Sequence, residues 1–183
     1  MRLNFLKLVI FLTISPLLPR DALAELLDDH CPVTQIKADN GQTLLFFEHV
    51  FADGVHDLAI AQAQDSTQGL SVESQTLKRV TFGGEKDACN FSNLAIARGG
   101  DWGWHLVWSS AKKPSLYYAR MDGEAWVSSP VKRLSVSSIA EVALVAELSK
   151  VTINWLDMDD DKHYAAISDD EGRSWQRPQL VIK

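Results

Sequence analysis

Short runs of β-forming residues, separated by turn residues, recur along most of this 183-residue chain. Nine such runs fall into three groups of three. They cover residues 33–38, 43–50 and 57–63, then 93–98, 105–109 and 116–120, then 141–147, 151–156 and 163–167. The breaks between them contain Gly, Asp, Asn, Lys or Pro, which are typical of turns between antiparallel strands. The pattern predicts an all-β protein.

The second and third groups also repeat each other in sequence. Trp108 is followed by Trp155 after 47 residues, and Trp126 is followed by Trp175 after 49 residues. A weaker copy precedes them, so that the repeats lie near residues 33–80, 91–135 and 140–183. Each copy has room for about four strands, the content of one β-propeller blade, which must stack on its neighbours to bury both faces. We expect about three propeller-like blades; an irregular β-sandwich is the alternative.

A turn motif in the third repeat supports the blade interpretation. Residues 168–175 read Ser-Asp-Asp-Glu-Gly-Arg-Ser-Trp and fit the pattern S-x-D-x-G-x-[S/T]-W. This motif resembles the Asp-box of the sialidase-type (BNR) repeat proteins, which are β-propellers. Residues 120–126 contain a degenerate copy that lacks the Ser. The resemblance covers residues 91–181 well and residues 33–80 poorly.

The physical role of this motif is structural. The resemblance places it on the hairpin between the third and fourth strands of a blade. Asp170 can accept hydrogen bonds from backbone N–H groups of the turn, with support from Ser168. Gly172 permits a positive φ, and Trp175 offers a large apolar face for packing. We therefore expect these four residues to maintain the fold and not to take part in catalysis.

The resemblance does not extend to sialidase catalysis. Enzymes of this kind hold the substrate carboxylate with three Arg, the first in an Arg-Ile-Pro motif that this sequence lacks. Closed propellers usually have about four to eight blades, whereas residues 25–183 provide about three. We expect a non-catalytic member that needs no cofactor. The alternative is a divergent glycan hydrolase that completes its ring by forming a homo-oligomer.

Residues 1–24 have the features of an export signal peptide. Two basic residues accompany an apolar run of about eleven residues, which is too short to span a bilayer. Ala22 and Ala24 are small residues at the positions that a signal peptidase reads. We expect a single mature domain, residues 25–183, that does not span a membrane and is periplasmic or secreted. A retained N-terminal anchor is the alternative.

The chain contains two cysteines, Cys31 and Cys89. An even pair in an oxidising compartment is most simply a disulfide. A redox or metal pair is the alternative, but neither Cys has C-x-x-C spacing. The sequence therefore predicts one structural disulfide that closes a loop of 58 residues.

The most unusual loop is Gly-rich and carries two indole rings, over residues 99–104. Exposed aromatic side chains mark contact surfaces for proteins or sugars. Asp101, Trp102 and Trp104 are therefore the candidate binding residues, with partly exposed rings. The alternative is that the rings cover the end of an open sheet.

A metal site is not expected. Residues 157–161 place three carboxylates at alternate positions, as calcium loops do. However, Lys162 stands where such loops want Gly, and Ser168 stands where they want Glu. We interpret the segment as a solvated hairpin tip. The five His are scattered without ligand spacing.

These observations favour an exported, non-catalytic binding protein that recognises a protein partner or a glycan. The formal net charge of −6 disfavours nucleic acid as the partner. A periplasmic inhibitor or immunity protein is a third class that small size, acidity and one disulfide permit. The sequence does not name the ligand.

Overall fold

The computed structural model describes residues 31–37, 41, 43–66, 69–72, 76–82, 84, 86–87, 89–100, 103–123 and 125–181. The expected signal peptide lies outside these residues. The described residues form thirteen β-strands and no α-helix, so the chain is all-β as the sequence predicts. No helix among them is long and apolar enough to cross a membrane.

The strands form three antiparallel sheets in which, apart from β5, strands that follow one another in the chain pair with each other. The first sheet contains β1 (Val33–Lys37), β2 (Thr43–Val50), β3 (His56–Ser66) and β4 (Gly69–Val72), with β5 (Lys78–Arg79) paired to β3. The second contains β6 (Phe91–Gly99), β7 (Gly103–Ser110), β8 (Ser115–Asp122) and β9 (Lys132–Ser135). The third contains β10 (Ile139–Glu147), β11 (Lys150–Asp157), β12 (Lys162–Ser168) and β13 (Gln179–Leu180).

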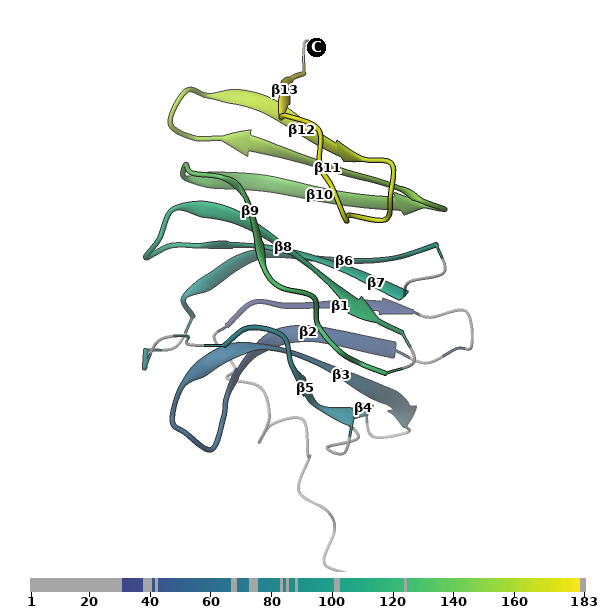
Figure 1. The fold of residues 1–183 in the computed structure, drawn as a ribbon. Helices are drawn as coiled ribbons and strands as arrows, with labels where there is room; N and C mark the ends of the chain where they lie inside the picture. The colour runs from purple at the N-terminus through teal and green to yellow at the C-terminus, as the bar shows by residue number, and fades with distance from the viewer. Residues whose placement is uncertain are drawn as a thin grey trace, which may run out of the picture.

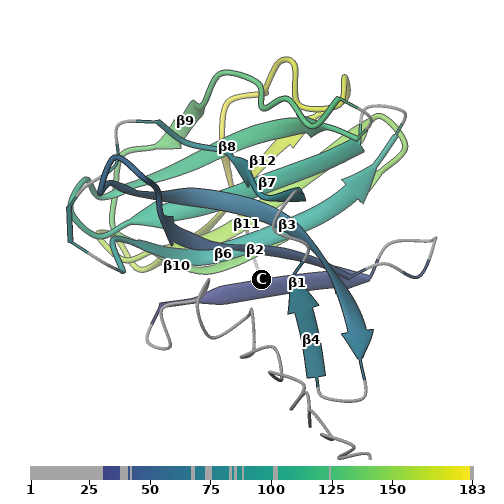
Figure 2. The ribbon, with the colours of Figure 1, turned by 90° about the horizontal axis from the view of Figure 1, so that it is seen from below.

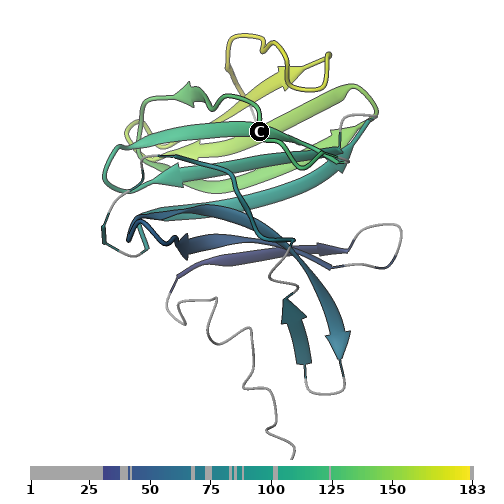
Figure 3. The same ribbon diagram turned by 60° about the horizontal axis from the view of Figure 1, so that its bottom comes forward.

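The three sheets stack on one another in chain order (Figure 1). The first strands of neighbouring sheets lie side by side, β1 against β6 and β6 against β10. The β3–β4 hairpin extends away from the stack (Figures 2 and 3). Within the part of the chain that the structure describes, the sheets do not close into a ring. The structure thus shows three stacked sheets, of five, four and four strands, without showing a propeller.

The second and third sheets repeat each other in detail. Trp108 and Tyr117 are cross-strand neighbours whose ring centroids lie 6.0 Å apart at an interplanar angle of 20°. Trp155 and Tyr164 have the same relation, at 6.0 Å and 23°. Both first strands contain a register shift, one after Ser92 and one after Ala140. Asn93 and Glu141 occupy these irregularities with φ of 51° and 50°.

Two apolar layers hold the stack together. The first layer, between the first and second sheets, joins Leu44, Phe46, Leu58 and Ile60 to Trp104, Leu106, Trp108 and Met121. The second layer, between the second and third sheets, joins Val107, Leu116 and Tyr118 to Val151, Ile153 and Trp155. Because side chains alternate along a strand, β7 supplies both layers and is buried on both faces. This explains its nearly continuous apolar sequence.

Candidate functional site

A pocket of about 210 Å³ lies where the chain passes from the first sheet to the second. Its lining comes from β3, β6, β7 and β8, and from the connections between β5 and β6, β7 and β8, and β8 and β9. The apolar part of the lining consists of Phe82, Phe91, Trp108, Tyr117 and Val131. An aromatic concavity with a few polar groups is the usual form of a binding site. This pocket is our candidate functional site.

The stacked pair of Trp108 and Tyr117 forms one aromatic wall. Strand alternation turns both rings toward the first sheet, because cross-strand partners lie on the same face. Phe91 begins the neighbouring strand and packs against the same layer. These rings come from three adjacent, hydrogen-bonded strands of the second sheet, which support the wall.

Phe82 stands out because it lines the pocket and is nevertheless 76% exposed. Its ring is supported by the guanidinium of Arg79, whose Cζ lies 5.3 Å from the Phe82 centroid and 4.6 Å from that of Phe51. A cation over an aromatic face is attractive, and more so when partly desolvated. Phe82 is therefore an exposed aromatic side chain that the Arg79 guanidinium contacts on one face.

Arg79 is itself held by two carboxylates. Its Nε donates to Asp57 Oδ2 at 2.9 Å, its Nη2 donates to the same oxygen, and its Nη1 donates to Asp53 Oδ2 at 2.8 Å. These hydrogen bonds raise the pKa of Arg79, and the bond from Arg79 lowers the pKa of Asp53. The guanidinium stays charged and stays in place beneath Phe82.

Four polar lining residues, Asp57, Thr81, Asn90 and Ser110, form hydrogen bonds within the protein. Asp57 is fully buried, and besides its bonds from Arg79 it accepts one from Thr81 Oγ1 at 2.6 Å. Thr81 Oγ1 in turn accepts from Leu58 N at 2.9 Å. Asn90 donates its side-chain amide to the Asp87 carbonyl, and Ser110 Oγ accepts from Lys113 N at 3.3 Å. Much of the hydrogen-bonding capacity of the lining is therefore already used.

This arrangement does not provide paired carboxylates for glycoside hydrolysis. That reaction requires two carboxyl groups on opposite sides of the bond that breaks. Among the described lining residues, Asp57 is the only acid, and Arg79 and Thr81 occupy its oxygens. The described lining therefore offers no second carboxyl group to pair with Asp57.

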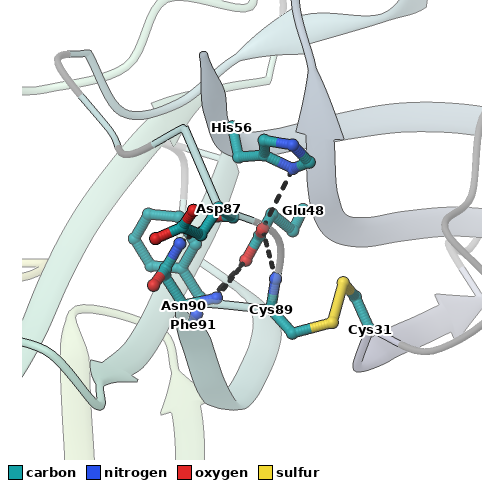
Figure 4. The surroundings of a disulfide bond; sticks show 7 residues. All are labelled: Cys31, Glu48, His56, Asp87, Cys89, Asn90 and Phe91. Atoms are coloured by element: carbon teal, nitrogen blue, oxygen red, sulfur yellow. Dashed lines mark hydrogen bonds and ion pairs between the residues drawn. A yellow bond between two sulfur atoms is a disulfide. The ribbon is translucent and has the colours of Figure 1, made fainter. Parts of the chain in front are cut away.

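The wall that contains Asn90 and Phe91 is fixed by a buried glutamate (Figure 4). Glu48, on β2, is 3% exposed, and its Oε1 accepts from Cys89 N at 2.7 Å. Its Oε2 accepts from Asn90 N at 2.9 Å and from Phe91 N at 3.2 Å. His56 Nδ1 lies 3.2 Å from Oε1. Three successive N–H groups thus converge on one carboxylate, as in an anion-binding nest.

The predicted disulfide joins Cys31 and Cys89 in this same region. The two Cα atoms lie 4.9 Å apart, within the usual range for a disulfide. Cys89 has a φ of 58°, in the left-handed region. The residue that carries the disulfide therefore also begins the segment that Glu48 binds.

Trp104, one of the three binding residues expected in the Gly-rich loop, is not exposed. Trp104 is 5% exposed and belongs to the first layer, so the expectation of an exposed ring is wrong at this position. It occupies the second position of β7, where alternation turns it inward with Leu106 and Trp108. Arg98 lies over its ring at 5.8 Å. Asp101 and Trp102 lie outside the described residues.

The turn after β12 has a closed set of hydrogen bonds. Asp170 Oδ1 accepts from Ser174 N at 2.8 Å and from Ser168 Oγ at 2.7 Å, and Oδ2 accepts from Ser174 Oγ at 2.6 Å. Ser168 Oγ also accepts from Gly172 N at 2.8 Å. Hydrogen bonds from Ser174 and Ser168 hold the pKa of Asp170 well below its usual range. The carboxylate organises the turn.

The same turn packs on the second sheet. The Trp175 ring meets Tyr118 edge to face at 4.7 Å between centroids. Gly172 has a φ of 75°, and a Cβ there would lie 1.7 Å from the Tyr118 hydroxyl, so no other residue fits. Tyr118 Oη lies 2.7 Å from His105 Nδ1. Burial lowers the pKa of His105 to about 4, with a further contribution from Arg120.

The acidic hairpin tip between β11 and β12 also bonds internally. Asp157 Oδ1 accepts from Asp159 N at 3.0 Å, and Asp160 Oδ2 accepts from Tyr164 Oη at 2.7 Å. In the part of the chain that is described, no group of three or more His, Cys, Asp or Glu side chains is placed to hold a metal ion.

Sequence reasoning missed Phe82, Arg79 and Glu48. Phe82 lies in an irregular connection and belongs to no β-run, and Glu48 follows the apolar run of β2 without any local sign of its partners. Comparison with known proteins supplies no further guide, because no protein-family model and no curated protein gives a significant match to this sequence.

Proposed function

We propose that this chain is an exported, non-catalytic binding protein that captures a partner protein by accepting one apolar side chain into the pocket between its first and second sheets. The observation that carries this proposal is Phe82, a large aromatic side chain that is 76% exposed and fixed by Arg79 at the rim of an aromatic pocket. Rigid aromatic anchors beside a pocket are typical of the energetic centre of protein interfaces.

The state of the polar groups favours a protein over a glycan. A sugar ring needs several free donors and acceptors to satisfy its hydroxyl groups, because buried polar groups without partners are costly. Here Asp57, Thr81 and Asn90 are bonded inside the protein. The apolar part of the lining is largely aromatic, and it matches an apolar side chain better than a sugar.

The repeat architecture is part of the proposal. The equivalent Trp–Tyr pairs and the hydrogen-bonded turn at Asp170 support the resemblance to sialidase-type repeat proteins. We take the three sheets as propeller-like blades that serve as a scaffold. The disulfide and the signal-like residues 1–24 support a periplasmic or secreted location. A periplasmic inhibitor is one form that partner capture can take.

A titration with minimal side-chain mimics tests the proposal. N-acetyl-L-phenylalaninamide is added to isotope-labelled protein, and amide and indole chemical shifts are followed. We expect saturable shifts at Phe82, Phe91 and Trp108, with millimolar affinity. A methyl glycoside at the same concentration serves as the comparison and is expected to leave these signals unchanged. Shifts with the glycoside alone would overturn the choice of a protein partner.

A photo-crosslinking experiment in the native envelope tests the rim. A benzoylphenylalanine is placed at position 82 and, as a control, at position 148, because Leu148 is 83% exposed on another part of the molecule. We expect a discrete crosslinked species from position 82 only, which excess N-acetyl-L-phenylalaninamide suppresses. Equal crosslinking from both positions would contradict a specific contact at Phe82.

A further inference from the structure

One wall of the pocket belongs to a segment that is tied to the first sheet twice. Residues 89–91 lead into β6, the first strand of the second sheet, and Asn90 and Phe91 line the pocket. The disulfide connects Cys89 to Cys31, which lies just before β1. Glu48, on β2, binds the backbone of the same segment. Both links therefore anchor the start of the second sheet to the first.

The hydrogen bonds to Glu48 are strong enough to fix the position of residues 89–91. A buried carboxylate is costly unless it is paired and hydrogen-bonded, and charge-assisted bonds are stronger than neutral ones. The Glu48 side chain is 1% exposed and receives three backbone N–H groups and His56. If the segment moved, a buried charge would lose its partners. The segment is held where the carboxylate requires it.

The position of this segment determines the shape of the pocket. Phe91 pairs with Ser110 on β7, and both residues line the pocket. Asp57, on β3, also lines the pocket, and Arg79 and Thr81 hold it in the first sheet. Because the first sheet supplies Asp57 and the second supplies Phe91 and Ser110, the shape of the pocket depends on how residues 89–91 are placed against the first sheet.

We propose that Glu48 and the Cys31–Cys89 disulfide form a two-part clamp that positions the pocket wall, so that partner binding depends on the redox state of the disulfide. The inference rests on the proposed function of the pocket. Glu48 is a positioning residue and makes no contact with the bound group. With the disulfide intact, both links tie the wall to the first sheet; after reduction, only the Glu48 link of the two remains.

The reduction step is an ordinary thiol–disulfide exchange with a dithiol reductant. One thiolate of the reductant attacks a sulfur of the disulfide and releases one Cys as a thiolate; its second thiolate then attacks the mixed disulfide and releases the other Cys. Cys31 and Cys89 gain two electrons and two protons in total, and the reductant becomes a cyclic disulfide. Cys89 is exposed, so a reductant has access to it.

Three variants separate the parts of the clamp: Glu48→Gln, the pair Cys31→Ser with Cys89→Ser, and all three changes together. Gln has nearly the same volume but turns one acceptor into a donor that faces backbone N–H groups. Ile153→Ala is the matched control, because Ile153 lies in the second layer and its loss lowers stability without touching the pocket. Dithiothreitol applied to the unmodified protein provides the redox arm.

The first readout is affinity for N-acetyl-L-phenylalaninamide. We expect Glu48→Gln or loss of the disulfide to weaken binding severalfold, and the combined variant to weaken it by more than about tenfold, a difference that titration resolves. Dithiothreitol should reproduce the effect of the two Cys changes. The control Ile153→Ala should bind normally. Normal affinity in the combined variant would overturn the clamp and leave the pocket function standing.

The second readout does not require a ligand. Hydrogen exchange of the Asn90 and Phe91 amides reports directly whether the segment is held, and it should accelerate strongly in the combined variant but not in Ile153→Ala. Unchanged exchange would overturn the clamp even if the amide probe failed to bind any form of the protein. If the amide probe bound no form of the protein but exchange accelerated in the combined variant, the result would count against the proposed function alone.

Discussion

The two layers of the stack contain equivalent Trp–Tyr pairs, yet only the layer between the first and second sheets has our candidate site at its edge. Trp108 with Tyr117 and Trp155 with Tyr164 have nearly the same ring geometry. The connections differ: eleven residues, 80–90, join β5 to β6, whereas three, 136–138, join β9 to β10. The longer connection supplies Thr81, Phe82, Gly84 and Asn90 to the pocket.

On the proposed function, this difference makes the longer connection the source of the residues that distinguish the first layer from the second. The second layer is completed by a turn of the third sheet, in which Gly172 and Trp175 lie against Tyr118. At the first layer, the longer connection between β5 and β6 leaves space beside the rings of Trp108 and Tyr117. Rigid sheets with variable connections are a common way to position binding residues.

The largest expected effect comes from removing the buried indole of each layer. Trp155→Ala should lower the free energy of unfolding by about 3–5 kcal/mol, the usual cost for a large buried aromatic side chain. Binding of N-acetyl-L-phenylalaninamide by the folded fraction should be unchanged. Trp108→Ala should cost a similar amount of stability and also abolish binding. Chemical denaturation and titration check both; loss of binding in Trp155→Ala would erase the distinction between the layers.

The second layer should be the acid-sensitive one. His105 has a pKa of about 4 in the folded protein against 6.5 for an ordinary His, so the fold favours the neutral ring. Its stabilising contribution, about 3 kcal/mol, is complete above pH 6.5 and is lost as the pH falls toward 4. Urea denaturation at several pH values measures it. His105→Gln should remove most of this dependence, and an unchanged slope would rule out His105 as its source.

The complete and degenerate turns provide a matched pair of smaller effects. Asp170→Ala removes several hydrogen bonds from the third-sheet turn and should cost about 1–3 kcal/mol. Asp122, in the degenerate turn, accepts from Ala125 N at 2.5 Å, and Asp122→Ala should cost about 1 kcal/mol or less. Thermal or chemical unfolding compares them. If Asp170→Ala lost ligand binding with full stability, the turn would belong to a binding site.

Phe82→Ala should have the smallest effect on stability and a large effect on binding. Phe82→Ala removes a mostly exposed ring, so the free energy of unfolding should change by no more than about 0.5 kcal/mol. Binding of the phenylalaninamide probe should weaken strongly. Leu148→Ala, at another exposed apolar side chain, should change neither property. A large stability loss in Phe82→Ala would show that the ring belongs to the core.

The sequence was informative where structure is local. The run at residues 43–50 coincides with β2, and those at 105–109 and 151–156 fall within β7 and β11. The short edge strands β9 and β13 have no apolar run, since Lys, Arg and Gln occupy much of their length. The sequence predicted these two strands only because each repeat has room for about four strands.

The candidate site could not be predicted from the sequence because the residues that form it contact partners far away in the chain. Glu48 binds residues 41 to 43 positions later in the chain, and nothing near Glu48 in sequence indicates those partners. Trp104 shows the opposite error. Its Gly-rich neighbours suggest an exposed loop, but the strand begins at Gly103 and turns the indole into the core.

The disulfide also has a mechanical consequence, because Cys31 and Cys89 enclose the whole first sheet. A pulling force applied to the two ends of the chain passes through the sulfur atoms and bypasses the 58-residue loop. The second and third sheets are antiparallel meanders, so they unzip pair by pair from β13, which has two pairs. The oxidised chain therefore yields at its C-terminal end and extends roughly 200 Å less than the reduced chain.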